Sequence, residues 1–198
     1  MEDYDVVIIG SGPNGLSAAN VLVDAGLSVC VLEGRPTAGG GLRTEPLTLP
    51  GFLHDRCSAI HPMAILSPYF RTLNLHDFDL QWCATDVSVG QPLDDRPAAL
   101  LVKSVEETAE RLGIDGTAYK NLVSPFLAQG PSLLADLMGP LGIPKHPILM
   151  ARFGLIGLRG ATSAANRLFK EAPAKALFGG CAAHSILPLD WAGTAALG

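Results

Sequence analysis

The sequence predicts an α/β fold at its N-terminal end, followed by an α+β segment that is mainly helical. Residues 6–9 form a short, wholly apolar and β-branched run, which is typical of a parallel strand buried on both faces. A glycine-rich turn follows at residues 10–15, and residues 16–25 continue at helical spacing. A second apolar run occupies residues 29–32. The order strand, turn, helix, strand therefore predicts a parallel βαβ unit.

The turn at residues 10–15 reads Gly-Ser-Gly-Pro-Asn-Gly, the spacing of a dinucleotide phosphate loop. Gly10 permits the tight turn out of the strand, Gly12 lets the backbone approach a pyrophosphate, and Gly15 lets the helix pack close to the sheet. The diphosphate then lies on the helix N-terminus, where free N–H groups and the helix dipole favour negative charge. Pro13 and Asn14 complete this predicted cofactor-binding loop.

An acidic residue, Glu33, directly follows the second strand. A carboxylate at this place accepts hydrogen bonds from both ribose hydroxyls and repels a 2′-phosphate. A lone glycine motif is weak support for a site, and the alternative is a turn that merely joins a strand to a helix. Here the strand, turn, helix, second strand and acid occur in register, which predicts a nucleotide site.

A second glycine turn, Gly39-Gly40-Gly41-Leu42-Arg43-Thr44, comes soon after Glu33. The Arg43 guanidinium can meet a phosphate bidentately, and a simple NAD domain needs no such loop. With these motifs the sequence resembles the FAD-dependent amine oxidase and phytoene desaturase superfamily. The resemblance implies a Rossmann-like FAD-binding fold of the glutathione reductase type. The residues that would hold FAD by position are Gly10, Gly12, Gly15, Glu33, Gly40, Gly41, Arg43 and Thr44.

Two further stretches, at residues 50–52 and 57–62, resemble the bacterial phytoene desaturase-like oxidoreductases. This resemblance implies flavin-dependent removal of hydride from a C–H bond of a small lipophilic substrate. Members of the family are much longer and return to the flavin through a C-terminal glycine motif. The chain therefore resembles the N-terminal portion of such an enzyme, an incomplete unit that a second polypeptide would complete. Two alternatives stay open: an NAD-linked oxidoreductase, and a non-enzymatic binding protein similar to the Rab GDP-dissociation inhibitors.

Composition sets broad limits on the function. The 198 residues are 48% hydrophobic and 17% charged, which indicates a globular protein. The formal charge of −5 argues against a nucleic-acid partner. The four cysteines are scattered without a Cys-x-x-Cys pair, and no signal peptide or membrane-spanning run is present. These features predict a cytoplasmic protein.

We place a domain boundary near residue 76, with a FAD-binding βαβ unit and linker at 1–75 and a partial, helical substrate domain at 76–198. In the second part, residues 86–90 and 98–102 predict an antiparallel hairpin around a polar turn. Ser104 and Glu107 match a reciprocal capping box, and Asp115 is expected to cap the following helix.

The proline-rich connection from residue 45 to 75 carries His54, Asp55, Cys57 and His61, but none stands at a familiar metal-ligand spacing, so no metal site is predicted. One hypothesis is that this segment passes under the flavin, so that Ser58 or His61 lines the substrate side. The alternative is that these histidines support a turn. No catalytic residue is assigned.

Residues 145–175 hold six basic residues against the single acid Glu171, interleaved with apolar side chains. Basic and apolar residues on helices fit peripheral attachment to an anionic membrane surface. Packing against an acidic partner surface explains the pattern equally well.

Overall fold

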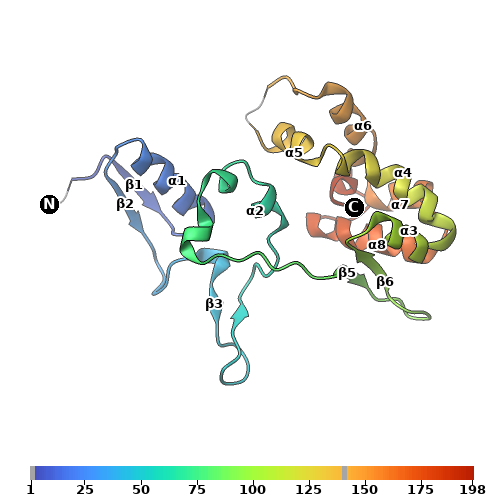
Figure 1. Cartoon of the computed structure of the whole chain (residues 1–198), viewed down its shortest axis with the longest axis horizontal. Helices are drawn as coiled ribbons and strands as arrows, with labels where there is room; N and C mark the ends of the chain where they lie inside the picture. The colour runs from blue at the N-terminus through green and yellow to red at the C-terminus, as the bar shows by residue number, and fades with distance from the viewer. Residues whose placement is uncertain (1–2, 140–141) are drawn as a thin grey trace. The chain divides into compact units, whose positions relative to one another are not determined.

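The computed structural model describes residues 3–139 and 142–198 (Figure 1). It contains two compact units, Met1–Ile65 and Leu66–Gly198. The short 3₁₀ helices at residues 70–72 and 75–78 belong to the second of these units, and the functional boundary near residue 76 stays a prediction. The assignment of 1–75 to the cofactor and of 76–198 to the substrate stays a prediction.

The first unit begins with the predicted βαβ unit. Strands β1 (Val6–Ile9) and β2 (Val29–Leu32) pair in parallel, with Val6 opposite Val29 and Ile9 opposite Leu32. Helix α1 (Pro13–Asp24) connects them and starts earlier than the expected residue 16. It ends in a left-handed glycine: Gly26 has φ +85°, and the Leu27 N–H donates to the Leu22 carbonyl at 3.1 Å. These bonds satisfy the last carbonyls of the helix.

Strand β1 is covered on one face only in the described chain, in contrast to the expected burial on both faces. Ile8 faces α1, since a Cβ on Gly15 would lie 3.5 Å from its Cγ2. On the other face, Val7 is 54% and Ile9 88% exposed. The second face of this wholly apolar strand is thus open, because among the described residues β1 and β2 are the only strands of this sheet.

The rest of the first unit is built on short elements. The 3₁₀ helix η1 (Gly40–Leu42) leads into β3 (Thr44–Glu45), which pairs antiparallel with β4 (His54–Asp55). Helix α2 (Pro62–Leu66) follows. These elements bring the second glycine turn back to the start of α1, as described below.

The second unit combines a hairpin with helices. After η2 (Phe70–Thr72) and η3 (Leu75–Phe78), strands β5 (Val87–Gln91) and β6 (Ala99–Val102) form the predicted antiparallel hairpin, with a bulge between Val87 and Val89. The helices that follow are α3 (Val105–Arg111), η4 (Gly113–Asp115), α4 (Gly116–Leu127), α5 (Gly130–Met138), α6 (Pro147–Gly157), α7 (Ala161–Leu168), α8 (Ala172–Ala182), η5 (Ala183–Ser185) and η6 (Thr194–Leu197).

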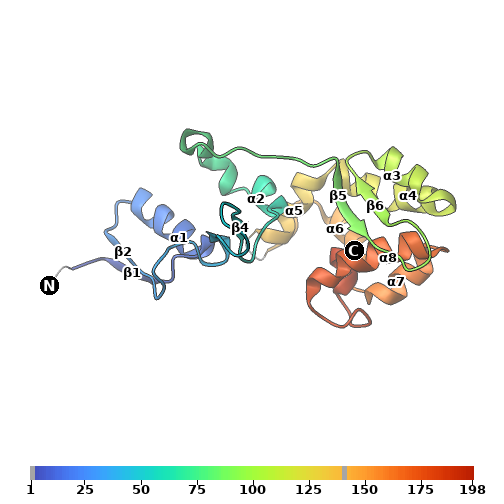
Figure 2. The ribbon, with the colours of Figure 1, turned by 90° about the horizontal axis from the view of Figure 1, so that it is seen from below.

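Helix α8 lies against the hairpin and forms the centre of the second unit (Figure 2). Its Leu177 and Phe178 are buried together with Phe169, whose ring centroid lies 6.0 Å from that of Phe178. Alanines on α7 and α8 allow the helices to approach closely, since small side chains let backbones pack near one another. No helix in the described parts of the chain has the length and apolar character needed to cross a membrane.

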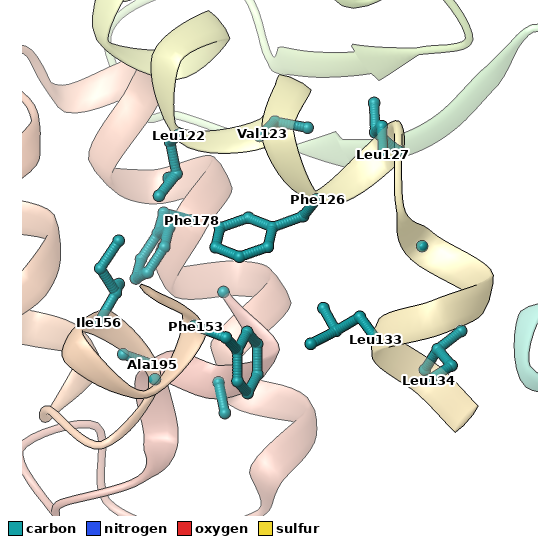
Figure 3. A pocket seen from close by; sticks show the side chains of 14 residues that line it. Leu122, Val123, Phe126, Leu127, Leu133, Leu134, Phe153, Ile156, Phe178 and Ala195 are labelled. Atoms are coloured by element: carbon teal, nitrogen blue, oxygen red, sulfur yellow. The ribbon is translucent and has the colours of Figure 1, made fainter. Parts of the chain in front are cut away.

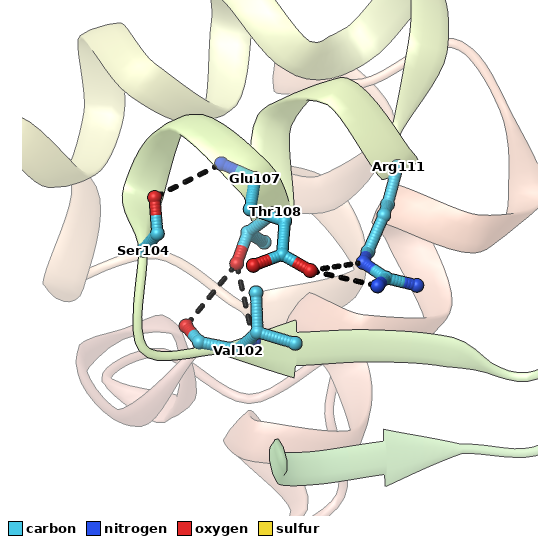
Figure 4. A network of polar contacts seen from close by, with 5 residues as sticks. All are labelled: Val102, Ser104, Glu107, Thr108 and Arg111. Atoms are coloured by element: carbon cyan, nitrogen blue, oxygen red, sulfur yellow. Dashed lines mark hydrogen bonds and ion pairs between the residues drawn. The ribbon is translucent and has the colours of Figure 1, made fainter. Parts of the chain in front are cut away.

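The start of α3 confirms half of the predicted capping box (Figure 4). The Ser104 hydroxyl accepts a hydrogen bond from the Glu107 N–H at 3.1 Å. The Glu107 side chain, however, does not return to the cap: its Oε1 accepts bonds from Arg111 at 2.7 and 3.2 Å. An ion pair four residues along the helix therefore replaces the reciprocal bond.

Asp115 stands at the expected N-cap of α4, but its side chain makes no capping bond there. Its buried carboxylate instead accepts hydrogen bonds from the backbone N–H groups of Lys170 and Glu171, each at 2.8 Å. Since Glu171 is the N-cap of α8, the carboxylate lies at the positive end of that helix. Asp115 thus joins two helices that are distant in sequence.

Candidate dinucleotide-binding site

The turn between β1 and α1 requires two of its glycines. Gly10 has φ +96°, a conformation that side chains rarely adopt, and its N–H donates to the Leu32 carbonyl at 2.7 Å. A Cβ on Gly15 would lie 2.1 Å from the Gly10 carbonyl oxygen. Glycine at both positions therefore lets the chain turn sharply and lets α1 start close to the strand.

The N-terminus of α1 has no capping side chain. Gly12 is the N-cap, and Pro13, which lacks an N–H, occupies the first turn. The Leu16 N–H donates to the Gly12 carbonyl at 2.9 Å and closes the first helical turn. The N–H groups of Asn14 and Gly15 come before this bond, so they belong to the orphan donors that a helix presents at its N-terminus. Together with the helix dipole, these donors favour an anion.

The Glu33 carboxylate is held by the phosphate loop itself. Its Oε2 accepts bonds from the Ser11 N–H at 2.9 Å and from the Ser11 hydroxyl at 2.5 Å, and its Oε1 accepts one from the Arg35 N–H at 2.9 Å. The bonds from Ser11 are the main cause that lowers the pKa of Glu33 to about 2. Glu33 is therefore ionised at neutral pH and keeps acceptor capacity on Oε1.

The second glycine turn packs directly on the first. The Gly39 N–H donates to the Ser11 carbonyl at 2.9 Å, and a Cβ on Gly40 would lie 2.8 Å from the Cα of Gly12. Gly39 and Gly40 have φ values of +115° and +56°. The two glycine loops are thus in backbone contact, and a side chain on Gly40 would separate them.

Arg43 and Thr44 both make bonds within the second loop and its hairpin. The Arg43 Nε donates to the Gly40 carbonyl at 3.0 Å, and the nearby guanidinium also contributes to the lowered pKa of Glu33. The Thr44 hydroxyl donates to Asp55 Oδ1 at 2.7 Å across the β3–β4 pair. The remaining N–H groups of Arg43 are the ones that can meet a phosphate.

The structure therefore brings together the first loop, Glu33 and the second loop, but it ties Thr44 to Asp55. The sequence analysis gives three contributors no role in the site: Ser11, Gly39 and Asp55. Ser11 is buried and bonds to both Glu33 and Gly39, yet it stands at a variable position of the glycine motif. For Gly39, the available signal in the sequence is that it adds a third glycine to the Gly40-Gly41 doublet.

The histidines of the connection form local contacts. His54 Nε2 lies 2.6 Å from the Thr48 hydroxyl, and His61 Nδ1 lies 3.4 Å from the Ser58 hydroxyl. The Ser58 N–H donates to the Gly41 carbonyl at 3.1 Å, so this segment runs beside the second glycine loop. Within the described residues, no group of three or more His, Cys, Asp or Glu side chains is placed to hold a metal ion.

This geometry is that of a Rossmann-like fold. Residues 8–73 match the protein family described as NAD(P)-binding Rossmann-like domain. The chain is 40% identical over 155 residues to the mouse pyridine nucleotide-disulfide oxidoreductase domain-containing protein 2, covering 75% of this chain and 25% of that protein. It is 32% identical over 112 residues to one of the subunits of limonene dehydrogenase from Castellaniella defragrans, covering 57% and 20%.

Shorter and structural likenesses point the same way. A flavin-containing amine oxidase of Danio rerio is 60% identical over 37 residues, 19% of this chain and 7% of that protein. A solved structure of a putrescine oxidase variant matches with a TM-score of 0.55 at 20% identity, covering 98% of this chain and 40% of that one. The structural match confirms the predicted Rossmann-like fold, and the sequence matches confirm the resemblance to the FAD-dependent amine oxidase superfamily. The chain spans a quarter or less of the curated relatives' length.

Proposed function

We propose that this chain supplies the FAD-binding part of an FAD-dependent oxidoreductase of the phytoene desaturase-like type, which removes hydride from a C–H bond of a lipophilic substrate. The observation that carries the proposal is the contact between the two glycine loops. Ser11 of the first loop binds the ionised Glu33 and also accepts a hydrogen bond from the Gly39 N–H of the second loop. The test is the absorbance spectrum of the purified protein, first alone and then after co-expression with the polypeptide encoded beside it. If neither preparation shows a flavin spectrum, the proposal is overturned.

The residues present fit the adenosine diphosphate end of FAD. The backbone at Gly12, where an added Cβ would meet only the Gly40 Cα at 3.9 Å, and the N–H groups of Asn14 and Gly15 would receive the pyrophosphate. The Arg43 guanidinium would add positive charge. Glu33 Oε1 would accept a bond from a ribose hydroxyl. When bound, the isoalloxazine supplies the hydride-accepting chemistry. The chain's own part is to bind and orient the cofactor.

The two alternative functions make different predictions for the same measurement. An NAD-linked oxidoreductase binds a nicotinamide cofactor and shows no flavin absorbance, and the contact of Gly12 with Gly40 speaks against it, because a simple NAD domain needs no second glycine loop. A binding protein similar to the GDP-dissociation inhibitors has no use for the phosphate loop. The complete set of Gly10, Gly12 and Gly15 with Glu33 favours cofactor binding.

Two observations support the finer assignment to a lipophilic substrate and a second polypeptide. The Castellaniella relative, which matches more than half of this chain, is named for a hydrocarbon, limonene, and as one of an enzyme's subunits. In addition, the exposed Val7 and Ile9 leave one face of the β1–β2 pair open to a further apolar layer. A two-stranded sheet needs such a layer for stability.

Ser58 and His61 are proposed to line the substrate side of the cofactor. Support comes from the bond between the Ser58 N–H and the Gly41 carbonyl, which keeps this segment beside the second glycine loop. If His61 lines the substrate side, His61→Ala lowers substrate turnover without changing flavin content. Unchanged turnover in His61→Ala would leave the histidine as a turn-supporting residue.

We also propose peripheral contact with an anionic membrane through residues 145–175. On α6, Ile148 and Leu155 are 85% and 69% exposed, and the exposed Arg152 lies on the same helical face, four residues after Ile148 and three before Leu155. Arg159, just beyond the end of the helix, donates from Nε to the Leu155 carbonyl at 2.8 Å. An exposed apolar and basic face suits an anionic lipid surface. Co-flotation with anionic liposomes, reduced in the variant Arg152→Glu/Arg159→Glu, tests this; absence of co-flotation favours the acidic partner surface instead.

A further inference from the structure

The second unit contains a cavity of about 270 Å³ among its helices, which is partly open to solvent (Figure 3). Its walls come from α4, α5, α6, α8 and η6. The side chains that matter most are Leu122, Phe126, Leu133, Phe153, Ile156 and Phe178. Every lining residue is a Leu, Val, Ile, Phe, Ala or Gly, so that no lining side chain carries a charge or a hydrogen-bonding group.

Packed helices hold the walls of this cavity in place. Leu133 on α5 and Phe178 on α8 are buried. The rings of Phe126 on α4 and Phe153 on α6 meet edge to face, with centroids 5.9 Å apart and an interplanar angle of 85°. Figure 3 shows these side chains pointing toward one space from different helices. The cavity is therefore formed before any ligand binds.

The chemistry of the lining selects the ligand. Water finds no hydrogen-bond partner among apolar side chains, and for this reason enclosed apolar cavities of about 150 Å³ bind benzene. The same lining favours a hydrocarbon over water on the inner walls of this partly open cavity. A protonated amine placed among these side chains would lose part of its hydration with no carboxylate to replace it, which is unfavourable. The space is close to the lower end of ligand pockets, about 300 Å³, so the ligand must be compact.

We propose that this cavity is a binding site for a compact hydrocarbon group. The inference rests on the proposed function and deepens it: the substrate class becomes a hydrocarbon without an amine, in contrast to the amine oxidases that share the fold. The site lies wholly within the Leu66–Gly198 unit, so that hydrocarbon binding does not require bound flavin.

Naphthalene serves as the probe, titrated into the full-length chain and followed by its fluorescence. We expect saturable binding at one site, and binding of 1-naphthylmethylamine that is weaker by roughly tenfold or more. Leu134→Trp fills the cavity and abolishes naphthalene binding. Leu137→Trp is the matched control, because Leu137 lies on the same helix α5, is exposed, and does not line the cavity. Val123→Thr adds a hydroxyl to the lining at nearly constant shape and weakens binding several-fold.

Circular dichroism spectra confirm that each variant is folded. The inference is overturned if naphthalene binding does not saturate. It is also overturned if Leu134→Trp and Leu137→Trp bind naphthalene equally well and Val123→Thr has no effect on binding. Flavin absorbance is measured on the same samples, which separates the two proposals. Loss of naphthalene binding with flavin retained counts against the hydrocarbon site alone, whereas absence of flavin with naphthalene binding retained counts against the proposed function and supports the site.

Discussion

Glu33 Oε2 accepts hydrogen bonds from both the N–H and the hydroxyl of Ser11, at 2.9 and 2.5 Å. The acid after the second strand is thereby tied to the phosphate loop after the first. Ser11 also accepts a bond from Gly39, through its carbonyl, so one buried serine joins Glu33 and both glycine loops. The site is organised in advance of cofactor binding, which lowers the cost of ordering it.

Replacing Ser11 tests this bond. In Ser11→Ala the hydroxyl bond is lost while the backbone bond remains, so the pKa of Glu33 rises from about 2 toward its ordinary value of 4.5. Because the folded pKa is the lower one, Glu33 stabilises the folded state above pH 4.5, and this contribution is lost as the pH falls from 4.5 to about 2. Carbon-13 NMR titration of the Glu33 carboxyl measures the change. The control Ser163→Ala, at an exposed position on α7, leaves the pKa unchanged; an unaltered pKa in Ser11→Ala contradicts the assignment.

Alanine substitutions at Gly40 and at Gly12 should affect the contact between the two glycine loops differently. In Gly40→Ala the Cβ overlaps the Gly12 backbone at a φ of +56°, so the loop contact weakens by roughly 1–3 kcal/mol. In Gly12→Ala the new Cβ meets Gly40 at an ordinary 3.9 Å, which leaves the loop contact intact but occupies the space proposed for the pyrophosphate. Hydrogen exchange of the Gly39 N–H reports the contact, and flavin absorbance reports binding.

We expect faster exchange at Gly39 only in Gly40→Ala, and loss of flavin binding in both variants. Gly34→Ala, at an open position without a positive φ, is the control for both measurements. Full flavin binding by Gly12→Ala would show that no pyrophosphate approaches this turn.

The sequence was sufficient for local features and insufficient for contacts between distant segments. Alternating and continuous apolar runs predicted β1, β2 and the β5–β6 hairpin, and Ser104 was recognised as a cap from its spacing to Glu107. The bond between Ser11 and Glu33 could not be predicted, because it depends on how two parallel strands end side by side. For the same reason Asp115 was assigned to the neighbouring helix rather than to Lys170 and Glu171.

Thr108 is expected to stabilise the junction of β6 and α3 (Figure 4). Its fully buried hydroxyl accepts a bond from the Val102 N–H at 3.1 Å and donates to the Val102 carbonyl at 3.3 Å. Thr108→Val keeps the shape but leaves the buried Val102 N–H unsatisfied, which lowers the free energy of unfolding by about 1–3 kcal/mol. Urea unfolding followed by circular dichroism measures the loss. Thr117→Val, exposed on α4, should change it little, and equal losses in the two variants would refute the role of the hydroxyl.

Asp115 offers the test of the long-range connection in the second unit. Its buried carboxylate accepts bonds from the Lys170 and Glu171 N–H groups, and the two oxygens receive one bond each. In Asp115→Asn only one side-chain oxygen remains, and the amide group that replaces the other faces a backbone donor. We expect the free energy of unfolding to fall by about 1.5–3 kcal/mol, the range for bonds to charged groups. The exposed turn variant Asp94→Asn has the same change of charge and should stay near the wild-type value in urea unfolding. If Asp94→Asn destabilises the protein as much as Asp115→Asn does, overall charge rather than the bond to α8 is responsible.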